Sequence, residues 1–506
     1  MIEARYRKEG PAVRKVSCVH SRFRVMTASV RAAKMAIQWV VSFARTVLMR
    51  FWLRWLLLIL LPVGVLEAHD DPREPQHHHP PAKVADAVVH APQIMPSRIL
   101  LSWEGPPTTS AAVTWRTSEA VSQGLAEIAV ATDGPQFVQQ ARRVTAVTTP
   151  LDTDFGPARY HTVSFTELSP KTKYAYRVGD GTNWSEWFQF QTASEQPEPF
   201  SFVYFGDAQN DLRSMWSRVI REAVRDAPRA AFMLHAGDLI NRPESDTDWG
   251  EWFQAGGHLQ ATVPCIAAPG NHEYRVAQQL AGISTRITLS KYWRPSFAFP
   301  LNGPEKLPET AYFIDYQGAR IVVLNSNDRH LIQAEWLDTV LATNPQKWTI
   351  ITFHHPLYST AIGRDNPMIR KAWQGVFDKH QVDLVLQGHD HSYGRTGLMH
   401  GSNTDTGLTR QIPETGTVYV VSVSGPKMYG MQTRPFFRRT AEDTQLYQVI
   451  QIDGDTLKYV AHTATGRPYD GFTLQKRTGK PNALIEQVPP VPENRRPVEN
   501  DGKQEP

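Results

Sequence analysis

Cysteine is almost absent from this chain of 506 residues, which contains only Cys18 and Cys265. Cys18 lies in a segment that we expect to be removed, and a single remaining cysteine cannot form an internal disulfide. Cys265 lies in an apolar run with strand character, so we predict that it is a small buried hydrophobe. The cysteine content therefore excludes a scaffold that is held together by disulfides.

The chain also lacks an uninterrupted apolar run that is long enough for a transmembrane helix. Residues 55–61 are apolar, stand after two arginines and lead to Ala68, an order that is typical of a secretory signal peptide. We assign residues 1–68 to a leader, and Met49 is a candidate for the true start because signal peptides are usually shorter. We therefore expect export, to the periplasm or as a secreted protein, and an uncleaved membrane anchor is the alternative.

Excess positive charge is confined to the leader. Residues 1–68 hold 12 Lys and Arg against 3 Asp and Glu, whereas residues 69–506 hold 42 against 47. A mildly acidic body gives no reason to expect nucleic acid as a partner. Membrane contact is expected only through an uncleaved leader, and the sequence leaves the oligomeric state open.

Composition and hydrophobic patterning divide the rest of the chain into four parts. Residues 69–95 are rich in His and Pro and predict a disordered linker. Residues 96–195 contain short β-prone runs between turn residues, which favours an all-β sandwich. In residues 196–478 strands alternate with helices and further strands cluster late, which predicts an α/β (α+β) domain with mixed sheets. Residues 479–506 carry many charges and prolines and predict a disordered tail.

Five short strings of metal-ligating residue types stand out, and each follows an apolar run of strand character. In chain order they are Gly206-Asp207, Gly237-Asp238, Gly270-Asn271-His272-Glu273, His354-His355-Pro356 and Gly388-His389-Asp390-His391. Ligands of open α/β sheets bind outside the carboxyl ends of the strands. Five strands that each end in Asp, Asn or His therefore predict one site assembled from five loops, whereas a single such Asp is often only a helix N-cap.

The donor atoms of these strings are oxygen and nitrogen, a set that suits Fe, Zn or Mn. A carboxylate such as that of Asp238 can bridge two metal ions, and a pair about 3.5–4 Å apart can hold both the attacking and the leaving oxygen of a displacement. Such a pair also lowers the pKa of bound water and so supplies hydroxide without a strong base. We therefore predict two divalent or trivalent metal ions and the hydrolysis of a phosphate ester.

The five strings, in this order, resemble those of the calcineurin-like metallophosphoesterases, and most closely those of the purple acid phosphatases. The resemblance extends through residues 353–358 and 388–393. Residues 160–193 resemble the fibronectin-III-like N-terminal domain of the purple acid phosphatases. The resemblance implies a metallophosphoesterase double-sheet sandwich with flanking helices, preceded by an all-β fibronectin-III-like sandwich domain.

The resemblance also implies roles for single residues. The first metal would be held by Asp207, Asp238 and His391, and the second by the bridging Asp238 with Asn271, His354 and His389. His272 would face the substrate, where it stabilises the transition state or protonates the leaving group. His354 and His355 are adjacent and point to opposite sides of an extended segment. The resemblance assigns the metal to His354 and leaves His355 to contact the substrate or to support a ligand.

Two positions depart from the pattern of the family. The iron-binding tyrosine that belongs three residues after the bridging Asp is Asn241 here, and a histidine common two residues after the first Asp is Gln209. Asn241, Gln209 or water would complete the first metal site. Tyr393 and Arg395 are candidates for lining the mouth of the site, and packing of their loop is the alternative. His235 precedes the second string, and we favour a core histidine.

The implied function is acid-phosphatase-like hydrolysis of phosphate monoesters by metal-bound hydroxide, with His272 assisting the leaving group. The substrates would be small phosphorylated molecules. A phosphodiesterase on the same metal core is one alternative, because the motifs do not separate the two activities. A non-catalytic binding protein whose β domain carries the function is another, and the intact set of Asp, Asn and His argues against it.

Overall fold

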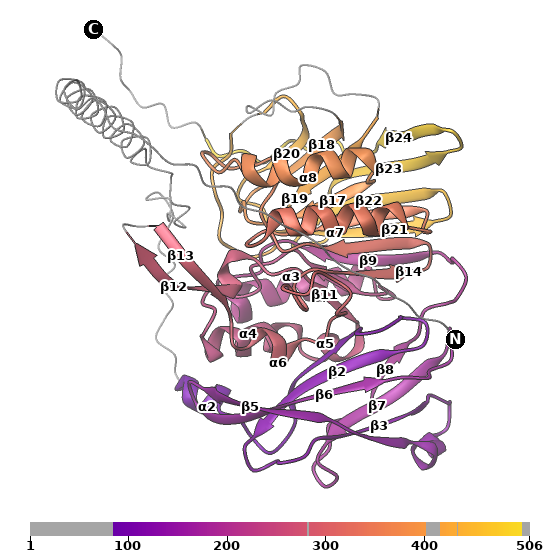
Figure 1. Ribbon diagram of the computed structural model, residues 1–506, viewed down its shortest axis with the longest axis vertical. Coiled ribbons are helices and arrows are strands. Elements are labelled where there is room, and N and C mark those ends of the chain that lie inside the picture. The colour runs from indigo at the N-terminus through magenta and orange to yellow at the C-terminus, as the bar shows by residue number, and fades with distance from the viewer. Residues whose placement is uncertain (1–83, 281–282, 401–414, 433, 498–506) are drawn as a thin grey trace, which may run out of the picture. The chain divides into compact units, whose positions relative to one another are not determined.

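The computed structural model describes residues 84–280, 283–400, 415–432 and 434–497, all of them within one compact unit that spans Asp70–Pro506 (Figure 1). The predicted leader with Met49, most of the linker and residues 498–506 of the tail lie outside the described residues. Within these ranges, no helix combines the length and the apolar character that crossing a membrane requires.

The first domain of the described chain is a sandwich of two four-stranded sheets. The first sheet has the order β1 (Ser97–Ser102), β2 (Ala111–Ser118), β6 (Gly156–Phe165), β5 (Val147–Thr153), and the second has the order β4 (Arg142–Thr145), β3 (Leu125–Val130), β7 (Lys173–Gly179), β8 (Phe188–Gln191). Phe188 and Phe190 of β8 are buried and its two glutamines are exposed, because successive side chains of a strand point to opposite faces. The inward residues, with Trp115 and Tyr176 among them, form one hydrophobic core.

The second domain contains two seven-stranded mixed sheets. The first has the order β11 (Cys265–Ala267), β10 (Met233–His235), β9 (Phe200–Phe205), β21 (Leu446–Asp453), β22 (Thr456–Thr463), β23 (Pro468–Arg477), β24 (Lys480–Glu486). The second has the order β14 (Tyr312–Tyr316), β15 (Ala319–Val323), β16 (Trp348–Thr352), β17 (Leu384–Gln387), β19 (Thr417–Val421), β18 (Tyr393–Met399), β20 (Phe437–Ala441). Strands β9, β10 and β11 are parallel neighbours, and so are β15, β16, β17 and β19.

Helices flank these sheets. Around the first sheet lie η2 (Leu212–Trp216), α3 (Ser217–Asp226), α4 (Asp246–Gly256) and α5 (His258–Thr262); on the second lie α7 (His330–Ala342) and α8 (Pro367–Lys379), side by side (Figure 1). Alternation along β16 divides its side chains between two cores: Ile350 joins the central core, whereas Ile351 packs with Trp373 and Phe377 of α8. Mixed sheets flanked by helices, behind an all-β sandwich, confirm the predicted fold class.

The sandwich and the second domain are joined by a packed junction. Leu100 and Trp103 of the sandwich belong to the central core of the second domain. The hydroxyl of Tyr176 donates to the backbone oxygen of Ala261 at 2.6 Å, and the hydroxyl of Thr114 donates to that of Ser296 at 2.7 Å. Because apolar and hydrogen-bonding groups both cross the junction, each domain covers surface that the other would otherwise expose.

Two sequence-based expectations about irregular segments are wrong for the residues that the structure describes. Within the expected linker, Asp86–His90 form helix α2, and the imidazole of His90 is buried. Within the expected tail, β24 pairs with β23 of the first sheet, and residues after β24 contact β20 of the second sheet and the segment that follows β20. There the backbone of Thr440 donates to Glu493 at 2.7 Å, and Arg496 pairs with Asp443 at 2.8 Å. A segment rich in charge is predicted to be disordered because it has little apolar surface to bury. Here the charged residues of the tail are held by partners from a distant part of the chain.

Candidate metal centre

The five strings converge at the carboxyl ends of five strands. Strings one to three follow β9, β10 and β11 of the first sheet, and strings four and five follow β16 and β17 of the second. Within each sheet these strands are parallel neighbours, so their carboxyl ends lie at one edge. The two sheets therefore contribute to one site, as the sequence predicted.

The side chains at this edge form two ligand groups that share Asp238. Asp238, His354 and His389 offer donor atoms within 4.8 Å of one another, and so do Asp207, Asp238 and His391. All of these residues are buried. The His354 Nε2 atom lies 3.1 Å from the nearer Asp238 oxygen, and His391 Nε2 lies 3.1 Å from Asp207 Oδ2. The structure thus brings together five of the six residues predicted as metal ligands in a pattern with one common carboxylate.

Asn271, the sixth predicted ligand, lies between two of the histidines. Its side-chain oxygen is 3.0 Å from His354 Nε2 and 3.0 Å from His389 Nδ1. The two histidine nitrogens are themselves 3.1 Å apart. Three acceptor-type atoms therefore face one another within a small volume.

The other nitrogen of two ligand histidines is held by the backbone. His354 Nδ1 donates to the oxygen of Ala236 at 2.9 Å, and His391 Nδ1 donates to that of Lys427 at 3.0 Å. These bonds direct the Nε2 lone pair of each ring into the cluster, as is usual for metal-binding histidines.

The donor set fits a pair of metal ions. Asp207 Oδ2 is buried and accepts no hydrogen bond from a residue in the described part of the chain. Burying an unpaired carboxylate oxygen is costly, and a cation removes that cost. The electrostatics agree: desolvation lowers the pKa of His354, but the carboxylates of Asp238 and Asp207 outweigh it and raise the pKa to about 9. The cluster therefore has a field that attracts positive charge.

Glycines and strained backbone allow this convergence. A Cβ atom on Gly270 would lie 2.1 Å from Asp238 Oδ1, and one on Gly388 would lie 2.2 Å from Asp207 Oδ1. Only glycine permits so close an approach at both positions. Asp238 and His389 themselves have positive φ angles of 50° and 73°. Such strain in non-glycine residues collects at functional sites.

His272 lies beside the cluster at the rim. Its Nδ1 donates to the backbone oxygen of Asn241 at 2.5 Å, and its Nε2 lies 4.0 Å from Asp238 Oδ2. Its side chain is 17% exposed, in contrast to the buried ligands. The structure therefore places His272 where a substrate could reach it.

The two departures from the family pattern differ in their placement. Gln209 is buried, and its Nε2 donates to Asp238 Oδ2 at 3.1 Å and lies 2.9 Å from His391 Nε2. Its Oε1 atom has no partner among the described residues. The Asn241 side chain makes no hydrogen bond to a described residue, and its backbone oxygen holds His272. Of the two candidates, Gln209 is the one inside the cluster.

His355 packs against a predicted ligand. Its ring centroid is 4.2 Å from that of His389, and its Nδ1 is hydrogen-bonded to the Ser326 hydroxyl at 2.8 Å. Burial and the neighbouring His354 lower its pKa well below the ordinary value. These contacts fit support of His389, and a catalytic role stays a prediction.

The prediction that Tyr393 and Arg395 line the mouth is wrong. Both side chains are fully buried, and both bind the carboxylate of Asp470, Tyr393 at 2.6 Å and Arg395 at 2.8 and 2.9 Å. They lie two residues apart on β18, so they share the face that is turned into the protein. The alternative, that they pack the structure, is the one observed.

Two further predictions concern residues of the core, one a cysteine and the other a histidine. Cys265 is a free, fully buried thiol, as predicted. His235 is a core histidine, stacked on Phe205 at 5.3 Å, but it is not satisfied: neither ring nitrogen has a partner in the described chain. Burial lowers its pKa to about 3, so the ring is neutral.

The sequence predicted no role for two residues that contact the cluster. The guanidinium of Arg364 lies 2.5 Å from His389 Nε2 and 5.0 Å from the Tyr429 ring centroid. Glu273 is buried and accepts backbone hydrogen bonds from Asp238 at 2.9 Å, Leu239 at 2.8 Å and Gly270 at 2.6 Å, which ties the second string to the third. Glu273 was visible in its string, whereas Arg364 lies in an irregular loop with no periodic signal.

Comparison with known proteins agrees with both domains. Residues 96–192 match the family model of the purple acid phosphatase N-terminal domain, and residues 200–393 match that of the calcineurin-like phosphoesterases. The Arabidopsis thaliana protein named probable inactive purple acid phosphatase 1 is 24% identical over 361 residues, which are 63% of this chain and 58% of that protein. The Fe(3+)-Zn(2+) purple acid phosphatase 12 of the same plant is 25% identical over 316 residues, 58% of this chain and 66% of that protein.

Among solved structures, the purple acid phosphatase from yellow lupin (Lupinus luteus) seeds superposes with a TM-score of 0.62 at 20% identity, over 75% of this chain and 74% of that one. At this identity the likeness concerns the fold. The chain spans 58–62% of the length of several curated relatives that it matches.

Proposed function

We propose that this chain, which belongs to the calcineurin-like metallophosphoesterases of the purple acid phosphatase type, hydrolyses phosphate monoesters with two metal ions. The observation that carries the proposal is the shared carboxylate: Asp238 belongs to both ligand groups. A single carboxylate common to two groups is the arrangement of a dinuclear site.

The metal ions would be held as the ligand groups suggest. Asp207, Asp238, His391 and Gln209 surround one position, and Asp238, Asn271, His354 and His389 surround the other. When bound, the two ions would polarise the phosphate oxygens and acidify a bound water. Fe, Zn and Mn suit these donors, and the Arabidopsis relative is named for an Fe(3+)-Zn(2+) pair.

The first site lacks the tyrosine phenolate that gives purple members of the family their name. Gln209 places a neutral amide beside Asp238 and His391, and its Oε1 atom is buried without a partner in the described chain. A neutral oxygen donor adds no negative charge, so this site should favour a divalent ion over a trivalent one.

His272 is suited to give a proton to the leaving group. Because its Nδ1–H is committed to the Asn241 oxygen, the proton that can be exchanged is the one on Nε2. This Nε2 atom lies at the rim of the cluster, 4.0 Å from Asp238 Oδ2. A proton on Nε2 would neutralise the alkoxide as the ester bond breaks.

Arg364 favours a monoester over a diester. Its guanidinium pairs with the buried Asp390 at 3.3 Å and lies beside His389, and its side chain is 15% exposed, so it can contact a substrate at the edge of the cluster. A phosphate monoester carries a second negative charge near neutral pH, and a guanidinium can bind two of its oxygens. A diester has only one charge and gains less from this contact.

The wider setting is part of the proposal. We expect small phosphorylated substrates and no nucleic-acid partner, because the body is mildly acidic. Export rests on the leader-like residues 1–68, which lie outside the described residues.

The test uses the full chain with its metal content measured. The protein should hydrolyse p-nitrophenyl phosphate faster than bis(p-nitrophenyl) phosphate, with close to two metal ions per chain. A faster reaction with the bis ester would instead identify a phosphodiesterase. Two bound metals with neither activity would favour a binding protein, which the name of the inactive Arabidopsis relative makes a real alternative.

A further inference from the structure

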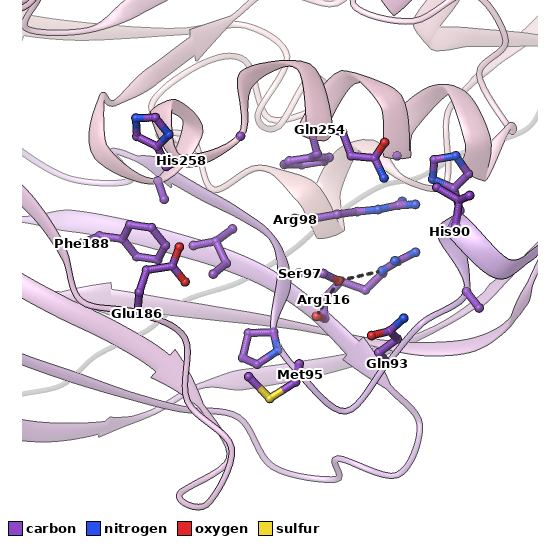
Figure 2. Close-up of a pocket in the computed structure, with 18 residues that line it drawn as sticks. His90, Gln93, Met95, Ser97, Arg98, Arg116, Glu186, Phe188, Gln254 and His258 are labelled. Atoms are coloured by element: carbon purple, nitrogen blue, oxygen red, sulfur yellow. Dashed lines mark hydrogen bonds between the residues drawn. The ribbon is translucent and has the colours of Figure 1, made fainter. Parts of the chain in front are cut away.

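A separate pocket lies at the junction between the sandwich and the second domain (Figure 2). It has a volume of about 350 Å³ and is lined by residues of α2, β1, β2, α4 and the start of α5. This volume is within the usual range for small-molecule sites. None of the lining residues belongs to the metal cluster.

Two buried arginines form one wall of the pocket. Arg98 is 9% exposed and Arg116 is 4% exposed. Both pair with one carboxylate, that of Asp246 at the start of α4: Arg98 at 2.6 Å and Arg116 at 3.1 Å. Arg98 also donates to the Tyr160 hydroxyl at 3.2 Å.

The two guanidinium groups of this wall share the carboxylate of Asp246, and the neighbouring hydroxyl of Tyr160 is neutral, because burial raises its pKa. Desolvation and repulsion from Arg98 lower the pKa of Arg116. The Nη1 of Arg116 is used by Asp246 and its Nε by Ser97, while Nη2 has no acceptor among the described residues. An oxyanion in the pocket could accept a charge-assisted hydrogen bond from this Nη2.

The pocket has a polar end and a more apolar end. In Figure 2 both guanidinium groups point toward the side on which His90 and Gln93 lie. The imidazole of His90 is buried and makes no hydrogen bond to a described residue, so it can donate to a ligand. Phe188 and Met95 lie away from the guanidinium ends, with the carboxylate of Glu186 beside Phe188, and Ile99 and Phe253 add apolar surface.

We propose that this pocket binds a small organic anion, whose carboxylate or phosphate group lies against Arg98 and Arg116 and whose apolar part lies against Phe188 and Met95. A guanidinium donates charge-assisted hydrogen bonds to a planar or tetrahedral oxyanion, and Nη2 of Arg116 is the donor that remains for it. The ligand would touch both domains and would therefore strengthen their junction. This inference does not depend on the activity of the metal centre.

The first experiment is a calorimetric titration of the metal-loaded full chain with benzoate and with benzamide, its neutral isostere. One benzoate should bind per chain, and benzamide should bind at least about tenfold more weakly, because a charge-assisted hydrogen bond is lost. In a second titration phenylphosphonate replaces benzoate. Comparing the two affinities shows whether the pocket prefers a phosphate-like group or a carboxylate. Benzoate should leave the KM for p-nitrophenyl phosphate unchanged, which separates the pocket from the metal centre.

The second experiment places variants in the pocket. Arg116→Gln should weaken benzoate at least about tenfold, whereas Arg142→Gln, on the exposed strand β4, should leave it unchanged. Met95 is 48% exposed, so Met95→Trp is a tolerable substitution that should fill the apolar end and block benzoate even if Arg116→Gln does not fold.

Three results would overturn the proposal. They are no saturable binding of either anion at about 10 mM, equal affinity for benzoate and benzamide, and unchanged affinity in the folded pocket variants. Competition between benzoate and p-nitrophenyl phosphate would also overturn it, because the anion would then bind at the metal centre.

Discussion

Two fully buried histidines have pKa values that are shifted in opposite directions. The pKa of His161, in the sandwich, is lowered, and that of His354, in the metal cluster, is raised. His161 lies in the sandwich between the hydroxyls of Thr117 and Thr148, at 2.8 and 2.9 Å, and stacks on Trp115. Burial lowers its pKa to about 4. Burial also acts on His354, but two carboxylates raise its pKa to about 9.

The difference shows that burial does not identify a functional histidine. His161 is surrounded by neutral groups that satisfy both ring nitrogens, so it has no field to offer a cation. His354 has the same exposure, but Asp238 and Asp207 make its surroundings negative. A metal site is therefore indicated by the negative charge of the groups that surround a buried histidine.

The largest effect should come from removing the shared charge of the cluster. Asp238→Asn keeps the size of the side chain but leaves two cations without their common anion, so we expect activity to fall by more than about 10³-fold, above the cost of losing one electrostatic contact. Metal content, measured by elemental analysis, should fall as well. His161→Gln is the matched control and should keep its metals and its turnover. An Asp238→Asn protein that retains both metals and near-normal turnover would show that the site assignment is wrong.

A smaller loss is expected at the rim. His272→Ala should keep the metals, because His272 is not a predicted ligand, and should lose about 10²-fold in rate, since a positioned acid is worth about that much or more. The loss should be larger for an alkyl phosphate than for p-nitrophenyl phosphate, whose leaving group needs little protonation. Equal losses with the two esters would argue for electrostatic stabilisation by His272 in place of proton donation.

His161 predicts how the sandwich responds to acid. The pKa is about 4 in the folded protein against 6.5 for the free ring, so between these values the unfolded chain binds the extra proton. Stability is therefore full above pH 6.5 and falls as the pH drops toward 4, by about 3 kcal/mol. His161→Gln should remove this part of the pH dependence, as measured by urea unfolding at pH 7 and pH 4.5. The same loss of stability in both proteins would assign the acid sensitivity to other groups.

The smallest effect concerns the positive charge beside the cluster. Arg364→Gln should raise the KM for p-nitrophenyl phosphate about tenfold, because a charge-assisted hydrogen bond to the substrate is lost. The effect on the bis ester should be smaller. Lys371→Gln, an exposed change on the nearby helix α8, serves as the control. If the KM values of both esters change equally, Arg364 acts by positioning His389 and does not distinguish substrates by their charge.

Much of the fold and of the metal cluster could be predicted from local pattern. Each string follows an apolar strand, and four of the five place a glycine directly before the first ligand residue. Every part of the signal therefore lies within a few residues. Neighbouring parallel strands then place their carboxyl ends at the same edge of the sheet. This is why Asp207, Asn271 and His391 were identified although they are far apart in the chain.

Other residues could not be predicted because their partners are distant. Tyr393 and Arg395 stand two and four residues after a ligand string, and only the contact with Asp470, more than 70 residues later, turns them into the core. Arg364 reaches His389 from an irregular loop. The tail was expected to be disordered, since charges such as that of Arg496 find their partners only in the folded structure, here Asp443 in the segment after β20.

The sequence by itself determined the two kinds of domain, the order of the strands that carry the ligands and the donor atoms that converge, because strand period and strand ends are local properties. Only the tertiary structure decided which donors lie together, which histidine is neutral and where two buried arginines share one carboxylate. Those properties depend on the field at one point, and that field is the sum of groups from segments as far apart as Arg98 and Asp246.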